Sequence, residues 1–256
     1  MKGGSNVEGR VYAQLDLYLK AGQMMLENGA ETYRAEDCVL FMFSKFGKGA
    51  INVFAIPTSI TIDITLDGRH YAGTRSIRRR GINLKKVDQV NTISRKVSNG
   101  TLEEDAAMES LLQIDKENEQ ALWLPVTASA LAAGTFALML NGGALEFLFA
   151  ALFCAVVRMI SVYTQKSSTL IFFQSLLGGF IPALAAFGVH AAIQTLDVNI
   201  VVIASMLPLF PGVATINAIR DTINGDLVSG VARGAEAIIT AVALAIGAAA
   251  VYSMFL

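Results

Sequence analysis

The chain has 256 residues, of which 54% are hydrophobic and only 16% are charged, and its mean hydropathy is +0.52. This composition excludes an ordinary water-soluble domain and indicates a membrane protein. Residues 1–120 hold 16 of the 20 Lys and Arg and 16 of the 21 Asp and Glu. We therefore expect a near-neutral soluble domain over 1–118 and a membrane domain over 119–256.

The first fifty residues predict two amphipathic helices, because apolar residues recur every three or four positions over 7–46. Between them, Asn28-Gly29 in "ENGAE" predicts a helix end, and Glu31 places a favourable charge at the start of the next helix. This part of the chain lacks the apolar segment and small-residue cleavage site of a secretory signal. We expect the first domain to stay in the cytoplasm.

Residues 51–77 switch to a period of two. Ile60, Ile62 and Ile64 alternate with polar residues, and Asp67-Gly68 is a strong two-residue hairpin signal. These features predict antiparallel strands. The soluble domain is therefore expected to belong to the α+β class.

Helical spacing returns after Gly81 and stops at Asn99-Gly100. Thr101 and Glu104 then have the spacing of a capping box, which predicts the start of another helix before the membrane domain.

The C-terminal half predicts a bundle of five transmembrane helices, each near the ~20 residues that cross a bilayer. The expected spans are 122–140, 144–164, 169–192, 198–219 and 231–254. With the first domain in the cytoplasm, Arg158 and Lys166 fall near one cytoplasmic loop and Arg220 and Arg233 near the other, while the opposite loops contain no Lys or Arg. The protein should be multi-pass in the plasma (inner) membrane, with its C-terminus outside.

The segment "PLFPGVATINAIRD" interrupts the fourth span. Pro208, Pro211 and Gly212 predict a helix break, which lipid tolerates only where protein or a water-filled cavity satisfies the freed backbone groups. A second half-helix beginning near Val213 would direct its positive N-terminal end into the membrane, where it favours a carboxylate. The alternative is a proline kink that serves packing only.

The third span contains Gly178, Gly179 and Pro182, which predict a second interruption. Two spans broken by Gly and Pro are typical of a transporter binding site.

Charged residues near the membrane are costly and therefore informative. Arg158 is either functional or reaches the nearby interface with its long side chain. Around the last cytoplasmic loop, the charges form either a gate or an ion-paired loop. They are Arg220, Asp221, Asp226, Arg233 and Glu236.

Other chemistries find little support. The basic run from Arg75 to Arg80 lacks an aromatic platform for nucleic acid, so contact with anionic lipid or an acidic helix is favoured. His70 and His190 lie far apart without a second ligand at metal spacing, and no nucleotide-binding fingerprint is present. Cys38 and Cys154 fall in different domains, so we expect no disulfide. We expect no catalytic residues, no metal, no cofactor and no nucleic-acid partner.

Three motifs in the same order resemble the threonine/serine exporter family, specifically its N-terminal module. They are "ENGAE" (27–31), "TRSIRRRGINLKKV" (74–87) and "PLFPGVATINAIRDTINGDLVSGVARG" (208–234), and the likeness covers nearly the whole chain. The resemblance implies a cytoplasmic α+β domain, a helical membrane domain and export of small amino acids. The chain is most similar to a split branch of the family, in which such a five-span protein pairs with a smaller membrane subunit and one pair exports succinate.

The resemblance also implies that several motif positions are functional: Pro211, Gly212, Asn217, Asp221, Gly225 and Arg233. With the positions taken from the broken spans and the intramembrane charges, the predicted substrate-binding and translocation residues are Pro211, Gly212, Asn217, Arg220, Asp221, Gly225, Arg233, Gly178, Gly179, Pro182 and Arg158.

The leading hypothesis is a subunit of a secondary transporter that exports threonine, serine or succinate and needs a second small integral-membrane subunit, because five spans supply only half of an inverted repeat. One alternative is a membrane-anchored hydrolase-like enzyme that uses Glu31, Asp63 or Asp67 in the cytoplasmic domain. Another is a structural or regulatory membrane subunit.

Overall fold

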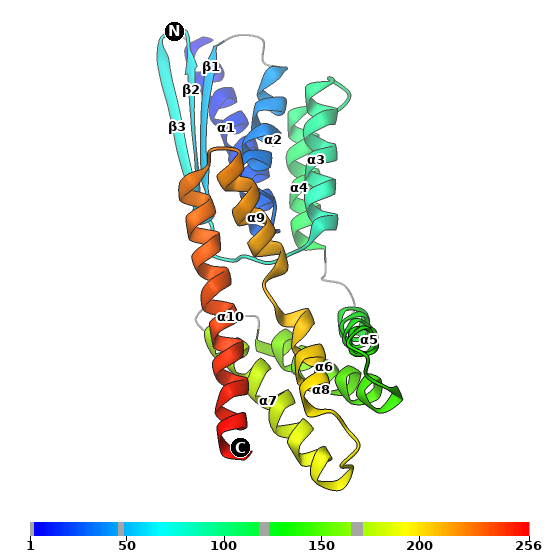
Figure 1. Cartoon of the computed structure of the whole chain (residues 1–256). Helices are drawn as coiled ribbons and strands as arrows, with labels where there is room; N and C mark the ends of the chain where they lie inside the picture. Colours follow the sequence, from blue (N-terminus) through cyan, green and yellow to red (C-terminus); the bar gives the residue numbers. More distant parts are fainter. Residues whose placement is uncertain (1–2, 46–48, 118–122, 165–170, 256) are drawn as a thin grey trace. The chain divides into compact units, whose positions relative to one another are not determined.

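The computed structural model describes residues 3–45, 49–117, 123–164 and 171–255, which form mostly helices and one small sheet (Figure 1). The chain divides into two compact units. The first comprises Met1–Glu117 and Val213–Gly234, and the second comprises Asn118–Gly212 and Ala235–Leu256. The expected domain boundary at 118/119 and the loop residue Lys166 lie outside the described residues.

The first unit combines seven elements of the N-terminal part with two from the C-terminal half. They are α1 (Gly3–Glu27), α2 (Thr32–Ser44), β1 (Ala50–Ile56), β2 (Ser59–Leu66), β3 (Arg69–Ser76), α3 (Leu84–Ser98), α4 (Glu104–Lys116), most of α9 (Gly212–Ile223) and the start of α10 (Leu227–Phe255). The predicted order of helices and strands over residues 1–117 is confirmed.

The sheet is antiparallel in the order β1-β2-β3 (Figure 1). Ile60, Ile62 and Ile64 are buried on one face of β2, as their alternation predicts. Helix α1 packs on this face, and Gly22 lets it lie close to Ile60. Asp67 and Gly68 form the β2–β3 turn, both with positive φ.

The capping-box prediction for α4 is wrong. The helix begins at Glu104, and its N-cap residue Glu103 makes no side-chain capping hydrogen bond. Thr101 instead ends the preceding helix, because its backbone N–H and its hydroxyl both donate to the Lys96 carbonyl. This carbonyl lies in the last turn of α3, where backbone acceptors lack helical partners.

The second unit contains the remaining helices. They are α5 (Trp123–Met139), α6 (Ala144–Thr164), α7 (Ile171–Ala192), α8 (Val198–Met206), the short 3-10 helix η2 (Leu207–Leu209) and the rest of α10. Within the described ranges, α6, α7 and α10 are each long and apolar enough to cross a membrane, and the broken pair formed by α8–η2 and α9 gives a fourth span if counted as one. The fifth predicted span corresponds to α5, which is apolar but has only 17 residues.

Helix α7 is continuous, so the predicted break in the third span is wrong. Gly178 and Gly179 of α7 serve close packing. A Cβ added to Gly179 would lie 2.0 Å from the Leu244 carbonyl oxygen of α10, and one added to Gly247 would lie 2.0 Å from the Leu176 carbonyl oxygen of α7. Small residues of this kind let membrane helices approach where lipid provides no hydrophobic driving force.

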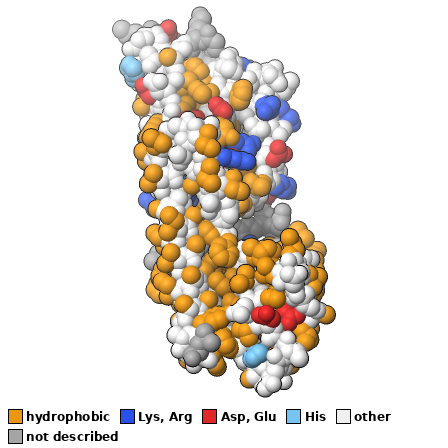
Figure 2. Space-filling view, viewed as in Figure 1, with side chains coloured by type: hydrophobic (Ala, Val, Ile, Leu, Met, Phe, Trp, Pro, Cys, Tyr) orange, Lys and Arg blue, Asp and Glu red, His pale blue; other side chains and the backbone are white. Residues whose placement is uncertain are grey.

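The two units differ in surface chemistry. In Figure 2, hydrophobic side chains cover most of the visible surface of the second unit, whereas most of the Lys, Arg, Asp and Glu side chains lie on the first unit. Cys38 and Cys154 are both buried and free, as expected.

Candidate functional site

The site is built on the turn between α1 and α2, residues 28–31, which we call the α1–α2 turn. Gly29 has φ +90°, so it ends α1 in the left-handed conformation that the sequence predicted. The turn is also fixed from a second motif, because Gly81 N–H donates to the Glu27 carbonyl and Asn83 N–H donates to the Asn28 carbonyl. The motifs "ENGAE" and "RGIN" therefore meet.

Two side chains from the C-terminal half bind carbonyl groups of this turn. Asn217 Nδ2 donates to Gly29 O over 3.0 Å, and Arg233 Nη2 donates to Ala30 O over 2.8 Å. Both side chains are largely buried. The third motif is thus joined to the first by direct hydrogen bonds to the backbone.

Asp221 of α9 caps the N-terminus of α2. The N-cap residue Glu31 makes no side-chain capping bond. Instead, Asp221 accepts from Thr32 N–H over 3.1 Å and from the Thr32 hydroxyl over 3.2 Å. Asp221 is fully buried, and Arg233 Nε lies 3.0 Å from its Oδ2. A carboxylate at this position satisfies free N–H groups and interacts favourably with the helix dipole, while Arg233 balances its charge.

Glu31 forms the outer part of the same cluster. Its carboxylate pairs with Arg220 and, over 3.4 Å, with Arg34. Burial alone raises the pKa of Glu31, but hydrogen bonds from its own backbone N–H and from Arg220, together with the charges of both arginines, outweigh burial and hold the pKa below its ordinary value. Glu31 is therefore an anion at neutral pH. We call Glu31, Thr32, Asn217, Arg220, Asp221 and Arg233 the polar cluster.

Two further carboxyl groups lie beside the polar cluster. Glu36 accepts a hydrogen bond from Ala55 N–H, yet burial and the charges of Asp226, Asp37 and Asp221 raise its pKa. Burial and the charge of Asp221 likewise raise the pKa of Asp226. Both groups accept protons more readily than free carboxyl groups, mainly because burial disfavours their charged form.

Gly225 closes the connection between α9 and α10. It has φ +92°, its N–H donates to Thr222 O, and Asp226 N–H donates to Asp221 O. This pair of bonds is the Schellman motif, which needs a residue in the left-handed region and so favours glycine.

The other predicted site residues lie in the second unit. The predicted helix break is confirmed, because η2 ends at Leu209 and α9 begins at Gly212, directly after Pro211. Gly178, Gly179 and Pro182 lie in the continuous helix α7. Arg158 lies in α6, and its Nε is buried without a hydrogen-bond partner among the described residues.

The structure thus brings together Asn217, Arg220, Asp221 and Arg233, which the sequence grouped. Sequence reasoning missed that Glu31 and Thr32 are their partners. The sequence held one signal for these contacts, because "ENGAE" and the Pro-Gly motif are both among the motifs that resemble the family. The three carboxyl groups proposed for an enzyme active site have different surroundings. Asp63 pairs with His70 on the sheet, and Asp67 forms a hairpin turn. Glu31 belongs to the polar cluster.

A charged α+β unit joined to apolar helices, with one broken helix pair and glycine-mediated helix packing, defines an α-helical membrane protein of the kind that includes transporters. Residues 16–255 match the family described as "Putative threonine/serine exporter" (ThrE), and the chain belongs to this family.

Curated relatives carry two different names. The chain is 22% identical to a "Probable threonine/serine exporter" of Mycobacterium tuberculosis over 91% of its own length, which is 44% of that longer protein. It is 26% identical to a "Probable succinate transporter subunit YjjP" of Klebsiella aerogenes, covering 93% of each chain, and 24% identical to the protein of the same name from Escherichia coli, covering 90% of each. No solved structure matches the chain.

Proposed function

We propose that this chain is one subunit of a secondary transporter that exports small carboxylate-bearing metabolites, namely threonine, serine or succinate, across the plasma membrane. Its family and the names of its relatives support a transport function. The observation that carries the proposal is the broken segment from α8 to α9. Asn217 and, across the next turn, Arg233 bind the α1–α2 turn, and Asp221 binds Thr32 at the start of α2.

The proposed substrate site is at the break itself. Pro211 and Gly212 precede the N-terminus of α9, where free N–H groups and the helix dipole attract a carboxylate. Within the second unit, Gly178, Gly179 and Pro182 of α7 and Arg158 of α6 belong to the translocation path in this proposal. Arg158 supplies a positive charge for an anionic substrate.

The polar cluster acts as a gate in this proposal. Asp221 holds α9 to the N-terminus of α2, and Asn217 of α9 and Arg233 of α10 bind the α1–α2 turn. Movement of α9 during transport requires these bonds to open, so the cluster stabilises one state of the transporter. Gly225 supplies the turn that joins α9 to α10.

We place the N-terminal domain, residues 1–118, in the cytoplasm and the C-terminus outside, with five spans that include the short helix α5. The positive-inside rule supports this orientation, because Arg158, Arg220 and Arg233 then fall on or near the cytoplasmic side. A second small integral-membrane subunit supplies the other half of the transporter. In support, two relatives of nearly equal length are named as subunits, and the chain spans less than half of a relative named as an exporter.

Counterflow in proteoliposomes tests the proposal. Vesicles containing the chain and its co-purifying membrane subunit are loaded with unlabelled threonine, serine or succinate, and uptake of the labelled compound is measured. We expect counterflow of at least one of the three with both subunits and little with this chain alone. Failure of all three compounds at confirmed incorporation of both subunits would falsify the proposed function.

A further inference from the structure

The loop that joins α7 to α8, residues 193–197, lies entirely in the second unit, and we call it the α7–α8 loop. Figure 1 shows it at the same end of the second unit as the C-terminal end of α10. Together with the first residues of α8, it is bound by one side chain from each of α6, α7 and α10. The transport proposal gives this loop no role, although it leads into the first half of the broken segment.

The contact from α6 is made by Glu146, a buried carboxylate in the first turn of that helix. Its Oε2 accepts from Gly143 N–H over 2.7 Å, which caps its own helix. Its Oε1 accepts from Asp197 N–H over 3.0 Å, 51 positions further along the chain. Capping needs only the first bond. The second bond ties α6 to the residue that precedes α8, and both bonds offset the cost of burying the charge.

Side chains of α7 and α10 bind on either side of Asp197. His190 Nδ1 lies 2.9 Å from the Leu196 carbonyl oxygen, and because a carbonyl only accepts, this nitrogen carries the hydrogen and donates it. The Tyr252 hydroxyl donates to Asn199 Oδ1 over 2.7 Å. Positions 196, 197 and 199 are thus each held by a different helix.

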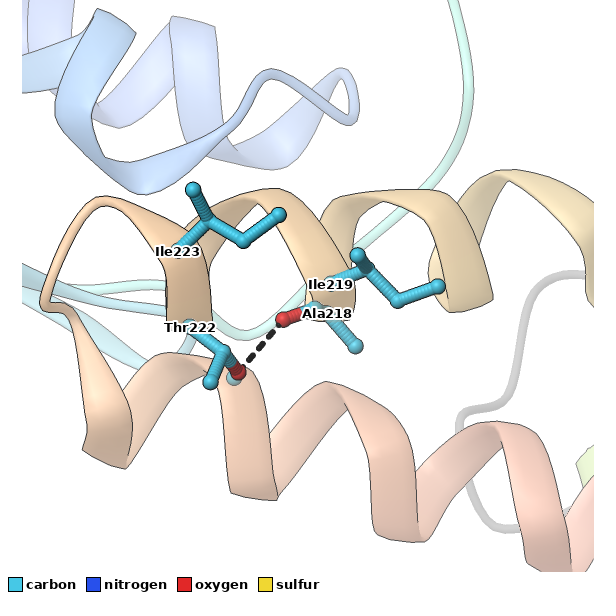
Figure 3. Close-up of a pocket in the computed structure, with 5 residues that line it drawn as sticks. Ala218, Ile219, Thr222 and Ile223 are labelled. Carbon is cyan, nitrogen blue, oxygen red and sulfur yellow. Dashed lines mark hydrogen bonds between the residues drawn. The ribbon is translucent and has the colours of Figure 1, made fainter.

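Helix α8 has nine residues and lies between this bound loop and the helix break. Ser205 of α8 donates its hydroxyl hydrogen to the Val201 carbonyl within the same helix. Beyond the break, Thr222 likewise donates to the Ala218 carbonyl of its own helix α9 (Figure 3). These hydroxyl groups stabilise their own helices, so the side-chain hydrogen bonds that tie α8 to other described helices lie at its N-terminal end. A short helix with a break at one end can tilt when its other end is released.

Resting on the proposed function, we propose that Glu146, His190 and Tyr252 form a latch that closes the outer side of the transporter by holding the start of α8. The side follows from the proposed orientation, because Tyr252 lies in the last turns of α10, whose C-terminus is outside. Opening requires Glu146 to release Asp197 N–H, after which α8 tilts about the break. Alternating access needs an outer gate as well as an inner one, and the polar cluster is the inner one in this proposal.

The test uses the full chain, with its co-purifying membrane subunit, in intact cells. Cys38 and Cys154, the two cysteines of the chain, are replaced by alanine, and Leu196→Cys introduces a reporter at a position that is 1% exposed. A membrane-impermeant maleimide is added outside the cells. The rate of labelling is measured with and without a load of threonine, serine or succinate.

We expect slow labelling of the parent and faster labelling when the cells are loaded with a transported compound. Glu146→Gln has one acceptor oxygen and cannot accept from both N–H groups, so labelling without substrate should rise about tenfold or more, as for a lost hydrogen bond to a charged group. Tyr252→Phe removes one neutral hydrogen bond and should raise it about two- to tenfold. Gln194→Ala is the matched control, because this side chain is exposed in the same loop, and should label like the parent.

A purely structural bond would change thermal unfolding but would not make labelling depend on substrate. Labelling of the parent that is the same with and without substrate therefore overturns the latch, as does a Glu146→Gln variant that labels like the parent. Labelling found only in inverted vesicles would place the loop on the cytoplasmic side and would also overturn it. If Glu146→Gln does not reach the membrane, Tyr252→Phe, which keeps its ring, decides the test in the same way.

Counterflow measured on the same proteins separates the two proposals. If the parent complex shows counterflow and the reporter behaves alike in all variants, the latch is wrong and the transport function stands. If the parent complex shows no counterflow of the three compounds although Glu146→Gln exposes the reporter, the transport function is wrong and the latch falls with it.

Discussion

The contacts that hold α9 and α10 in place differ between the two units. In the first unit, a buried ion pair joins Asp221 of α9 to Arg233 of α10. Asn217 and Arg233 donate hydrogen bonds to the α1–α2 turn, and Asp221 accepts hydrogen bonds from Thr32 at the start of α2. In the second unit, α7 and α10 pack backbone against backbone at Gly179 and Gly247. A hydrogen bond or ion pair is either formed or broken. Two helices that pack backbone against backbone leave no room for a larger side chain between them.

The largest effect is expected from breaking the buried ion pair. Asp221→Asn retains an acceptor for Thr32 but leaves Arg233 without its charge partner, and should destabilise the protein by about 3 kcal/mol or more. Thermal unfolding of the purified protein in detergent measures this change. Arg34→Gln is the control, because its pair with Glu31 is longer and partly exposed, and should cost less than about 1 kcal/mol. Equal effects of the two variants would refute the special role of Asp221.

The helix crossing in the second unit should be the next most sensitive. Gly179→Ala introduces a methyl group against the α10 backbone and should destabilise the protein by about 1–3 kcal/mol. Gly188→Ala in the same helix meets no atom within 4 Å and should be neutral or slightly stabilising. The midpoint of thermal unfolding in one detergent is the measurement. If Gly188→Ala is as harmful as Gly179→Ala, helix flexibility and not close packing explains the loss.

The break between η2 and α9 lies where the chain passes from the second unit to the first. Replacing Pro211 and Gly212 with alanine favours a continuous helix and removes the free N–H groups at the start of α9. We expect counterflow to fall about five- to thirtyfold, since a carboxylate at a helix N-terminus gains up to about 2 kcal/mol. Membrane abundance should remain normal. Unchanged counterflow would mean that the break serves packing only.

The smallest effect concerns the protonation of Glu36. Its pKa is raised by burial and by neighbouring carboxylates, so the folded protein holds this proton more tightly than the unfolded chain. The contribution of protonated Glu36 to stability is therefore fully present at pH values below its pKa in the unfolded chain, about 4.3. This contribution is lost as the pH rises through the higher pKa of the folded protein. Glu36→Gln keeps an acceptor for Ala55 N–H and should raise the unfolding midpoint at neutral pH by a few degrees.

The gain from Glu36→Gln should disappear near pH 4. Glu31 behaves in the opposite way, because its pKa is lowered, so its contribution is present at neutral pH and is lost in acid. A Glu36→Gln variant that is less stable than the parent at pH 7 would show that the carboxylate form is required.

Local patterns determined much of the fold. Alternation at Ile60, Ile62 and Ile64 predicted the buried face of β2, and the Asn28-Gly29 and Pro211-Gly212 pairs predicted a helix end and a helix break. These signals depend only on neighbouring residues, through side-chain period, the left-handed region and the missing proline donor. The same reasoning failed at α7, where glycines beside a proline suggested a break but provide contact with α10.

The sequence by itself determined the membrane class, the two kinds of region and the identity of the polar residues in the third motif, because hydropathy and backbone restrictions act locally. Only the tertiary structure decided that Asp221 caps a helix that begins 189 positions earlier in the chain and that Arg233 neutralises it. Hydrogen bonds to backbone N–H and carbonyl groups leave no complementary side-chain pattern, since every residue type carries the same peptide groups. The partners of the polar cluster become visible only when the folded chain brings α9 against the α1–α2 turn.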